Sequence, residues 1–155
     1  TLGEGHDKDF LTVGGMGHAN QIALGIALQR KNRHVFCLDG DGAILMHMGS
    51  LAISAQMQCD NLKHIILNNG VHDSVGGQAT VGHQIDIGLI AKAVGYKTVI
   101  QASTAIELKQ ALSILQENSG SSLLEIKIKK GFRKDLGRPT KSPLENKELF
   151  MEFIQ

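Results

Sequence analysis

The chain has 155 residues, a formal net charge of +1 and 42% hydrophobic residues. A chain of this length can bury a core without disulfides or metals, and its balanced composition argues against disorder and against a general electrostatic affinity for nucleic acid. No apolar run reaches the ~18 residues that a membrane span needs. Cys37 and Cys59 lie in apolar surroundings without zinc-type spacing, so we expect buried free thiols, a cytoplasmic location, and neither nucleic-acid nor membrane partners.

Helical spacing and short apolar runs alternate along the chain. Helices are expected over residues 18–30, 44–57, 86–94 and 105–116, and strands over residues 34–38, 64–68, 97–100 and 122–128. Strands that alternate with helices predict an α/β fold with a doubly wound, mainly parallel sheet. In such sheets ligands bind beyond the carboxyl ends of the strands.

The composition changes after about residue 130. Residues 131–155 are rich in charge, hold both prolines, and are predicted to end in a helix capped at Ser142 or Pro143. We interpret this segment as a solvated or packing arm of the same domain, with anion binding or a subunit contact as the alternative.

Eighteen glycines against two prolines is an unusual balance, and the glycines cluster in "TVGGMGHAN", "DGDG", "NNG" and "SVGGQ". Glycine clusters indicate places where the backbone must come close to something. The sequence therefore predicts ligand contacts made by the main chain.

Asp41 follows a predicted strand and precedes a predicted helix in "FCLDGDGAILMHMGS". A lone aspartate there can simply cap the helix. However, "LNNG" at residues 67–70 ends the next strand and brings amide side chains to the same edge. A carboxylate, an amide oxygen and a loop carbonyl suit Mg²⁺ or Ca²⁺ and not zinc. A magnesium ion with few protein ligands usually binds phosphate as well, which the amides of Ala43 and Ile44 would hold.

The pattern Gly40-Asp41-Gly42, 25 intervening residues, and Asn68-Asn69 resembles the motif of thiamine diphosphate enzymes. The resemblance implies a thiamine diphosphate-binding fold. It also implies that Mg²⁺ is held by Asp41, Asn69 and the main-chain carbonyl of Val71.

The upstream "VGGMG" is similar to the segment of that family that holds the aminopyrimidine ring. By this resemblance the Gly14 carbonyl accepts from the 4′-amino group, and Met16 enforces the V-shaped cofactor conformer; a plain core methionine is the alternative. Gly15 stands where a serine is usual, and Ala79 where proline is common. The cofactor-binding residues so implied are Gly14, Gly15, Met16, Gly40, Asp41, Gly42, Ala43, Ile44, Asn69, Val71, His72 and Asp73.

Four longer segments carry a closer resemblance, which covers nearly the whole chain. They are "DFLTVGGMGHANQIALGIAL", "GDGAILMHMGSL", "LNNGVHDSVGGQAT" and "RKDLGRPTKSPLENKELFM", and they are similar to phosphonopyruvate decarboxylases and, a little less, to the β subunits of sulfopyruvate decarboxylase. The implied reaction is decarboxylation of a 2-oxo acid with an anionic group, such as 3-phosphonopyruvate to phosphonoacetaldehyde and CO₂. Residues 1–130 would bind the diphosphate and Mg²⁺, with residues 131–155 as the arm and C-terminal helix.

His18 and His72 are the candidate catalytic residues, because each lies beside a glycine-rich segment that would face the cofactor. A histidine near pKa ~6.5 can donate a proton or bind a phosphonate. A structural histidine is the alternative for both. The remaining candidates, His34, His47, His64 and His83, are interpreted as structural.

The family's activating glutamate, which touches the pyrimidine N1′, belongs to a pyrimidine-binding domain of a neighbouring subunit. Glu4, Glu107, Glu117 and Glu125 fall outside any matching motif. The pyrimidine-binding domain is therefore expected to be absent from this chain, which begins at Thr1 and is expected to be a fragment or a processed piece. The resemblance implies a homo- or hetero-oligomer, at least a dimer, that is inactive without the partner domain or subunit.

Three other functions fit the sequence less well. A dinucleotide-binding module is disfavoured, because no G-x-G-x-x-G opens a helix with an acidic residue ~20 positions on. A non-catalytic cofactor-binding subunit is disfavoured by the intact Asp41 and Asn69, and carboligation of pyruvate by the "DLGRPTKSP" tail.

Overall fold

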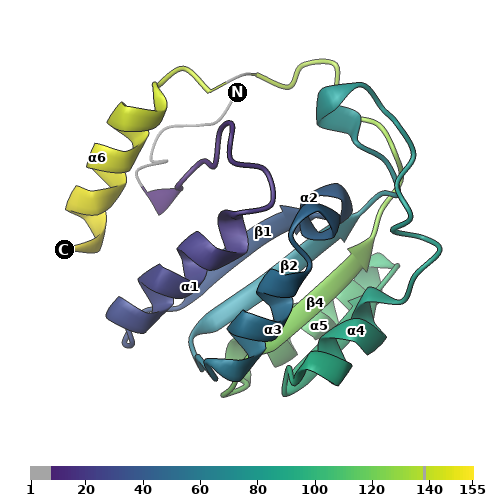
Figure 1. Cartoon of the computed structure of the whole chain (residues 1–155), viewed down its shortest axis with the longest axis horizontal. Coiled ribbons are helices and arrows are strands. Elements are labelled where there is room, and N and C mark those ends of the chain that lie inside the picture. The colour runs from purple at the N-terminus through teal and green to yellow at the C-terminus, as the bar shows by residue number, and fades with distance from the viewer. Residues whose placement is uncertain (1–7, 138) are drawn as a thin grey trace.

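The structure is a computed structural model that describes residues 8–137 and 139–155. Its centre is a parallel sheet of four strands in the order β1-β2-β4-β3. The strands are β1 (Val35–Gly40), β2 (Leu62–Asn68), β3 (Thr98–Ala102) and β4 (Ser122–Lys127). Helices cover both faces of the sheet, so the predicted α/β fold is confirmed (Figure 1).

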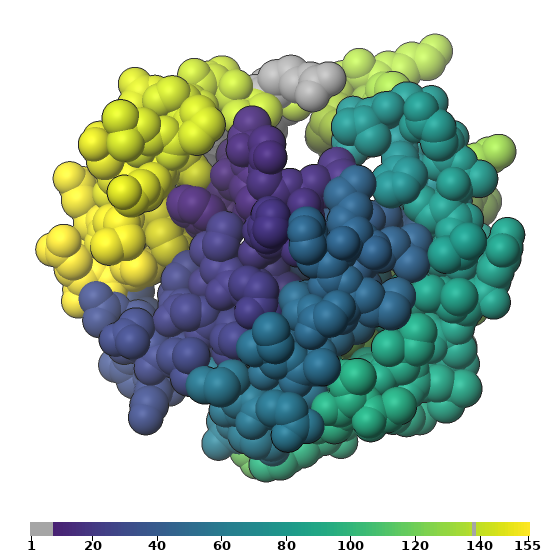
Figure 2. Space-filling view, in the orientation of Figure 1, coloured from purple at the N-terminus to yellow at the C-terminus, as the bar shows by residue number. Residues whose placement is uncertain are grey.

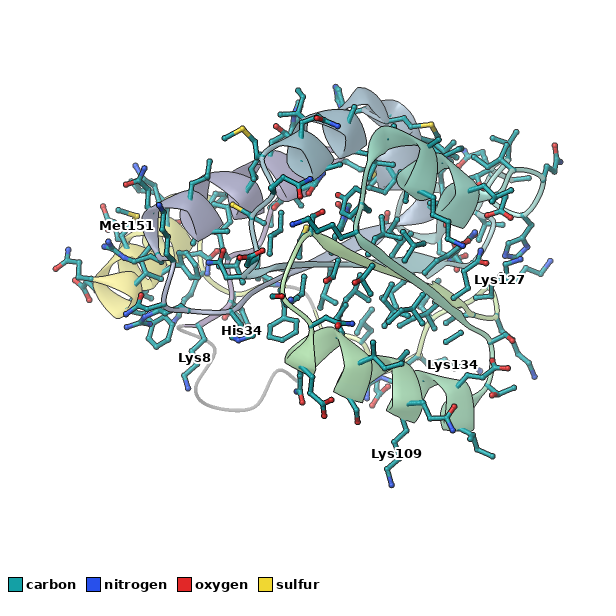
Figure 3. The ribbon with its side chains drawn as sticks, turned by 90° about the horizontal axis from the view of Figure 1, so that it is seen from below. Lys8, His34, Lys109, Lys127, Lys134 and Met151 are labelled. Atoms are coloured by element: carbon teal, nitrogen blue, oxygen red, sulfur yellow. The ribbon has the colours of Figure 1, made fainter. Side chains whose placement is uncertain are left out.

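Six α-helices of the described residues connect and flank the strands. They are α1 (Ala19–Gln29), α2 (Asp41–Met46), α3 (Gly49–Gln56), α4 (Ile87–Val94), α5 (Ala105–Glu117) and α6 (Pro143–Ile154), and a 3₁₀ turn, η2, spans Asp73–Val75. Seen along the sheet, α5 with Lys109 lies on one side and α1 to α4 lie on the other (Figure 3). The alternation of strand and helix explains why every strand pair is parallel.

Apolar side chains of alternate strand residues form a core on each face. On one face Ile66 and Leu123 pack with Leu51 and Ile87 from the helices above them. On the other face Leu124 packs against Leu115 of α5. Strands buried on both faces read as continuous apolar runs, which is the pattern that predicted them.

The region expected to be one helix over residues 44–57 consists of two. Helix α2 already begins at Asp41 and ends at Met46. The next residue, His47, leaves the helical region with a φ of −137° and a ψ of 51°, and α3 starts at Gly49. The Ser50 amide donates a hydrogen bond to the carbonyl of His47, three residues earlier, which makes a tight turn between the two helices. Glycine is a poor helix former, which favours a break at this point.

Helix α6 packs against residues 9–11 and lies beside α1 (Figure 2). The rings of Phe10 and Phe150 lie 5.6 Å apart, and the Leu11 amide donates to the Asn146 side chain over 2.8 Å. Ser142 caps the helix, with Glu145 completing a capping box, as the sequence predicted.

Cys37 and Cys59 are free and buried, as expected. None of the helices in the described part of the chain is long and apolar enough to cross a membrane.

Candidate functional site

Strands β1 and β2 end side by side, because Gly40 pairs with Leu67 in the sheet register. The residues that follow are therefore neighbours, and the Asn69 amide donates to Oδ1 of Asp41 over 3.3 Å. The Thr80 hydroxyl donates to Oδ2 of the same carboxylate. Asp41 is only 1% exposed, although it lies at the end of a strand where Figure 1 shows α2 beginning.

Asp41 is not the cap of its own helix. It is the first helical residue, Gly40 holds the capping position, and no side-chain hydrogen bond caps α2. The structure thus rules out helix capping as the role of the Asp41 carboxylate. Both of its oxygens instead face the loop that follows β2.

Asn69 and Val71 are the other two residues of the predicted oxygen set, and both lie in the loop after β2. Oδ1 of Asn69 accepts from the Val71 amide over 3.1 Å, and its Nδ2 donates to Asp73 over 2.9 Å, so the amide oxygen faces its own loop. Among the described residues no hydrogen bond reaches the Val71 carbonyl, which leaves this oxygen available. Asp73 also accepts from the Gly131 amide over 2.7 Å, which ties the loop to the segment after β4.

Two glycines make room for this arrangement. A Cβ at Gly82 would overlap the Asp41 carboxylate and would lie 2.8 Å from Oδ1 of Asn68. A Cβ at Gly42 would overlap the ring of His72. Since carboxylate, amide and carbonyl oxygens are hard ligands, the residues present fit a magnesium ion with phosphate oxygens.

The predicted pyrimidine segment borders a groove of about 1180 Å³ between α1, β1 and α6. Gly15, Met16, Gly40 and Ala43 line this groove, whereas Asp41 and Asn69 do not. The structure therefore brings four of the predicted cofactor residues to one groove, and Gly40 is adjacent in sequence to Asp41, which was predicted to bind Mg²⁺. Gly14 is exposed with a φ of +77°, a conformation that favours glycine.

The remaining predicted residues lie around α2. His72 is half-buried with its ring against Gly42, and His18 is exposed with its ring 4.2 Å from that of His47. The Ile44 side chain is 2% exposed and belongs to the core, so only its main chain can serve a ligand.

Sequence reasoning missed Thr80, Gly82 and Glu125. Thr80 and Gly82 lie in the glycine-rich loop that the sequence singled out, but the contact with Asp41 depends on how that loop folds back. Glu125 is an acidic residue between Leu124 and Ile126 in an otherwise apolar part of β4, which was a signal of an unusual buried group.

A second polar group, also missed, is buried beneath α1. Oδ2 of Asp39 lies 3.7 Å from the Cys37 sulfur and 3.1 Å from Nε2 of His64, whose Nδ1 lies 3.4 Å from the Tyr96 hydroxyl. Burial, and then the nearby Asp39 carboxylate, raise the pKa of the Cys37 thiol. The side-chain ligand atoms of Cys37, Asp39 and His64 lie within 4.8 Å of one another. The hydrogen bonds among these three residues explain why they lie together. His64 is thus structural, as the sequence indicated.

Comparison with known proteins gives the same class as the geometry. The family described as "Thiamine pyrophosphate enzyme, C-terminal TPP binding domain" matches residues 6–126. The chain belongs to this family. A solved structure from Mycobacterium smegmatis, described as a thiamin diphosphate-dependent enzyme, matches with a TM-score of 0.65 and 25% identity over 76% of this chain and 23% of that one.

Among curated relatives the chain is similar to two kinds of decarboxylase. It is 39% identical to phosphonopyruvate decarboxylase of Streptomyces viridochromogenes and 42% identical to that of Streptomyces hygroscopicus, over 96% and 95% of this chain. It spans 37% and 36% of the length of those two proteins. The sulfopyruvate decarboxylase β subunit of Methanococcus maripaludis is 30% identical over 96% of this chain and 79% of that subunit.

Proposed function

We propose that this chain serves in the thiamine diphosphate- and Mg²⁺-dependent decarboxylation of a 2-oxo acid that bears an anionic group, with 3-phosphonopyruvate as the substrate and phosphonoacetaldehyde and CO₂ as products. The observation that carries the proposal is the oxygen set of Asp41, Asn69 and Val71 at the sheet edge, next to a groove lined by the predicted pyrimidine segment. Identity to the named phosphonopyruvate decarboxylases exceeds that to the sulfopyruvate decarboxylase subunits.

In this proposal the chain's own residues bind and orient. Asp41, Asn69 and the Val71 carbonyl would hold Mg²⁺, and the Ala43 and Ile44 amides would hold the diphosphate. The Gly14 carbonyl would accept a hydrogen bond from the 4′-amino group of the aminopyrimidine, and Met16 would support the ring from the groove. The bound cofactor supplies an acceptor for the electron pair that remains when the carboxylate leaves as CO₂.

His72 and His18 are proposed to act on the substrate. The His72 ring lies against Gly42, which is next to the proposed metal ligand Asp41. This proximity supports a role for His72 in holding an anionic group or supplying a proton. His18 lies beside the pyrimidine segment with its ring exposed against His47, and its neighbours Gly17 and Ala19 line the groove.

The proposal requires a partner that carries the activating glutamate. Proteins named as β subunits of sulfopyruvate decarboxylase are among the relatives, which supports a pyrimidine-binding domain or subunit and a homo- or hetero-oligomer. Phe36 and Leu38 of β1 are 47% and 63% exposed on the face that α5 leaves open, and large apolar side chains on an edge strand favour coverage by further protein.

Two alternatives make different predictions. The chain can be a sulfopyruvate decarboxylase β subunit, which the 37% identity to the subunit of Methanothermobacter thermautotrophicus favours. It can also be a cofactor-binding subunit without catalysis, against which the complete Asp41, Asn69 and Val71 set argues.

A substrate assay of the complete enzyme that contains this chain tests the proposal. CO₂ release is measured with 3-phosphonopyruvate, sulfopyruvate and pyruvate, each with thiamine diphosphate and Mg²⁺. We expect the highest kcat/KM for 3-phosphonopyruvate, and loss of activity in Asp41→Ala but not in the surface variant Asp60→Ala. Preference for sulfopyruvate supports the first alternative, and full activity of Asp41→Ala would refute the metal site.

A further inference from the structure

Glu125 of β4 is a buried carboxylate at the same sheet edge as the proposed metal set, and only 1% of it is exposed. It pairs with Ile66 and Gln101 in the register of the sheet, so these three side chains share a face. Asn68, two residues after Ile66, lies on that face as well. Charged residues are almost never fully buried unless they have partners, so the contacts of Glu125 need an explanation.

The contacts of Glu125 are two side-chain amides. Oε1 accepts from Nδ2 of Asn68 over 2.8 Å, and Oε2 accepts from Nε2 of Gln101 over 2.7 Å. No ion pair with Glu125 occurs within residues 8–137 and 139–155. A carboxylate has only acceptors, so both neighbouring amides must present their NH₂ groups to it.

This requirement fixes the orientation of Asn68. Its Nδ2 donates one hydrogen bond to Glu125 and another to the Gly82 carbonyl, each over 2.8 Å. Oδ1 of Asn68 must then face the opposite way, where it accepts from the Gly70 amide over 3.2 Å. The side chain is 0% exposed, so water cannot replace any of these partners.

The Gly70 amide belongs to the loop that carries the proposed metal ligands. Asn69 stands before it and Val71 after it, and the Asn69 amide also donates to Asp41. We propose that Glu125 is a positioning residue that acts through Asn68 to hold the loop of residues 69–71 in its metal-binding conformation. The inference rests on the proposed function, because it concerns the same metal site.

Binding of Mn²⁺, a spectroscopic substitute for Mg²⁺, tests this role in the complete enzyme with thiamine diphosphate present. The free Mn²⁺ signal in electron paramagnetic resonance gives the dissociation constant for each variant. Glu125→Met removes both acceptors, and we expect it to weaken Mn²⁺ binding by about 10-fold or more, because partners behind metal ligands typically contribute about 10–100-fold. Glu125→Gln keeps an acceptor for Asn68 once Gln101 turns its amide, and should bind Mn²⁺ nearly as the wild type does.

Leu124→Ala is the matched control. Leu124 is the buried neighbour of Glu125 and points to the opposite face, toward α5. It should lower the melting temperature and leave Mn²⁺ affinity unchanged. Equal losses of affinity in Leu124→Ala and Glu125→Met would mean general destabilisation and overturn the inference, as would wild-type affinity in Glu125→Met.

Two further variants keep the result decisive. If Glu125→Met does not fold, Asn68→Ser breaks the same link from the other side and is expected to weaken Mn²⁺ binding about 10-fold or more. Unchanged affinity in Asn68→Ser overturns the inference. Wild-type enzyme that binds no Mn²⁺, or Asp41→Ala that binds it normally, overturns the proposed metal site itself, an outcome distinct from failure of Glu125 alone.

Discussion

Gly82→Ala should disable the metal site although it adds a single methyl group. The new Cβ would lie 2.8 Å from Oδ1 of Asn68 and 2.9 Å from Cβ of Asp41, whereas ordinary contact begins at 3.4 Å, and it would overlap the Asp41 carboxylate. The backbone of residue 82 cannot shift easily to relieve these contacts, because its amide donates to the Thr80 hydroxyl over 3.1 Å and its carbonyl accepts from Asn68 over 2.8 Å. Overpacking of this kind costs about 1–3 kcal/mol of stability.

The Asp41 carboxylate must move to make room for the methyl group. We therefore expect the affinity for Mg²⁺ to fall by more than the loss of folding stability alone would cause. We expect the dissociation constant for Mg²⁺, titrated calorimetrically with thiamine diphosphate present, to rise about 10–100-fold, or about 1.4–2.8 kcal/mol. Gly25→Ala is the control, because a Cβ there meets nothing within 4 Å in the middle of α1. This control should gain up to about 1 kcal/mol of stability with normal Mg²⁺ affinity. Wild-type affinity in Gly82→Ala would refute the close packing described around Asp41.

Three further predictions concern the rest of the chain. Ser142→Ala removes the hydroxyl that accepts from the Glu145 amide and should cost about 0.5–2 kcal/mol of unfolding free energy, measured by denaturant titration. Burial and Asp39 raise the pKa of Cys37, so the folded chain keeps the thiol proton where the unfolded chain loses it. The free energy of unfolding should therefore be independent of this thiol below about pH 8.5 and should fall as the pH rises above that value. Cys37 should also resist alkylation by iodoacetamide at about pH 8 until the chain is unfolded. The purified 155-residue chain alone should release no CO₂ from 2-oxo acids, and measurable decarboxylation would show that no partner glutamate is needed.

The sequence predicted the sheet and its helices because both signals are local. Apolar runs such as that of β2 and helical spacing such as that of α5 depend on neighbouring residues alone. The break between α2 and α3 was not predicted, since the apolar pattern continues through His47 and Met48 while the backbone turns. Element boundaries of this kind depend on tertiary contacts.

The candidate site was predictable in part for a similar reason. Asp41 and Asn69 follow strand ends, and parallel strands bring their carboxyl ends to one edge, so their proximity follows from topology. Thr80 contacts Asp41 from 39 residues away through an irregular loop. Glu125 of β4 reaches Asn68 of the neighbouring strand β2 through the register of the sheet. Neither contact leaves a periodic signal in the sequence.

A crystal structure of the complete enzyme with thiamine diphosphate and Mn²⁺ tests the central claim most directly. The anomalous signal of manganese locates the ion without reference to a prior interpretation of the site. We predict one peak within about 2.0–2.3 Å of Asp41, the Asn69 side-chain oxygen and the Val71 carbonyl. A peak elsewhere, for example beside Cys37, Asp39 and His64, with Asp41 still bonded only to Asn69 and Thr80, would contradict the account.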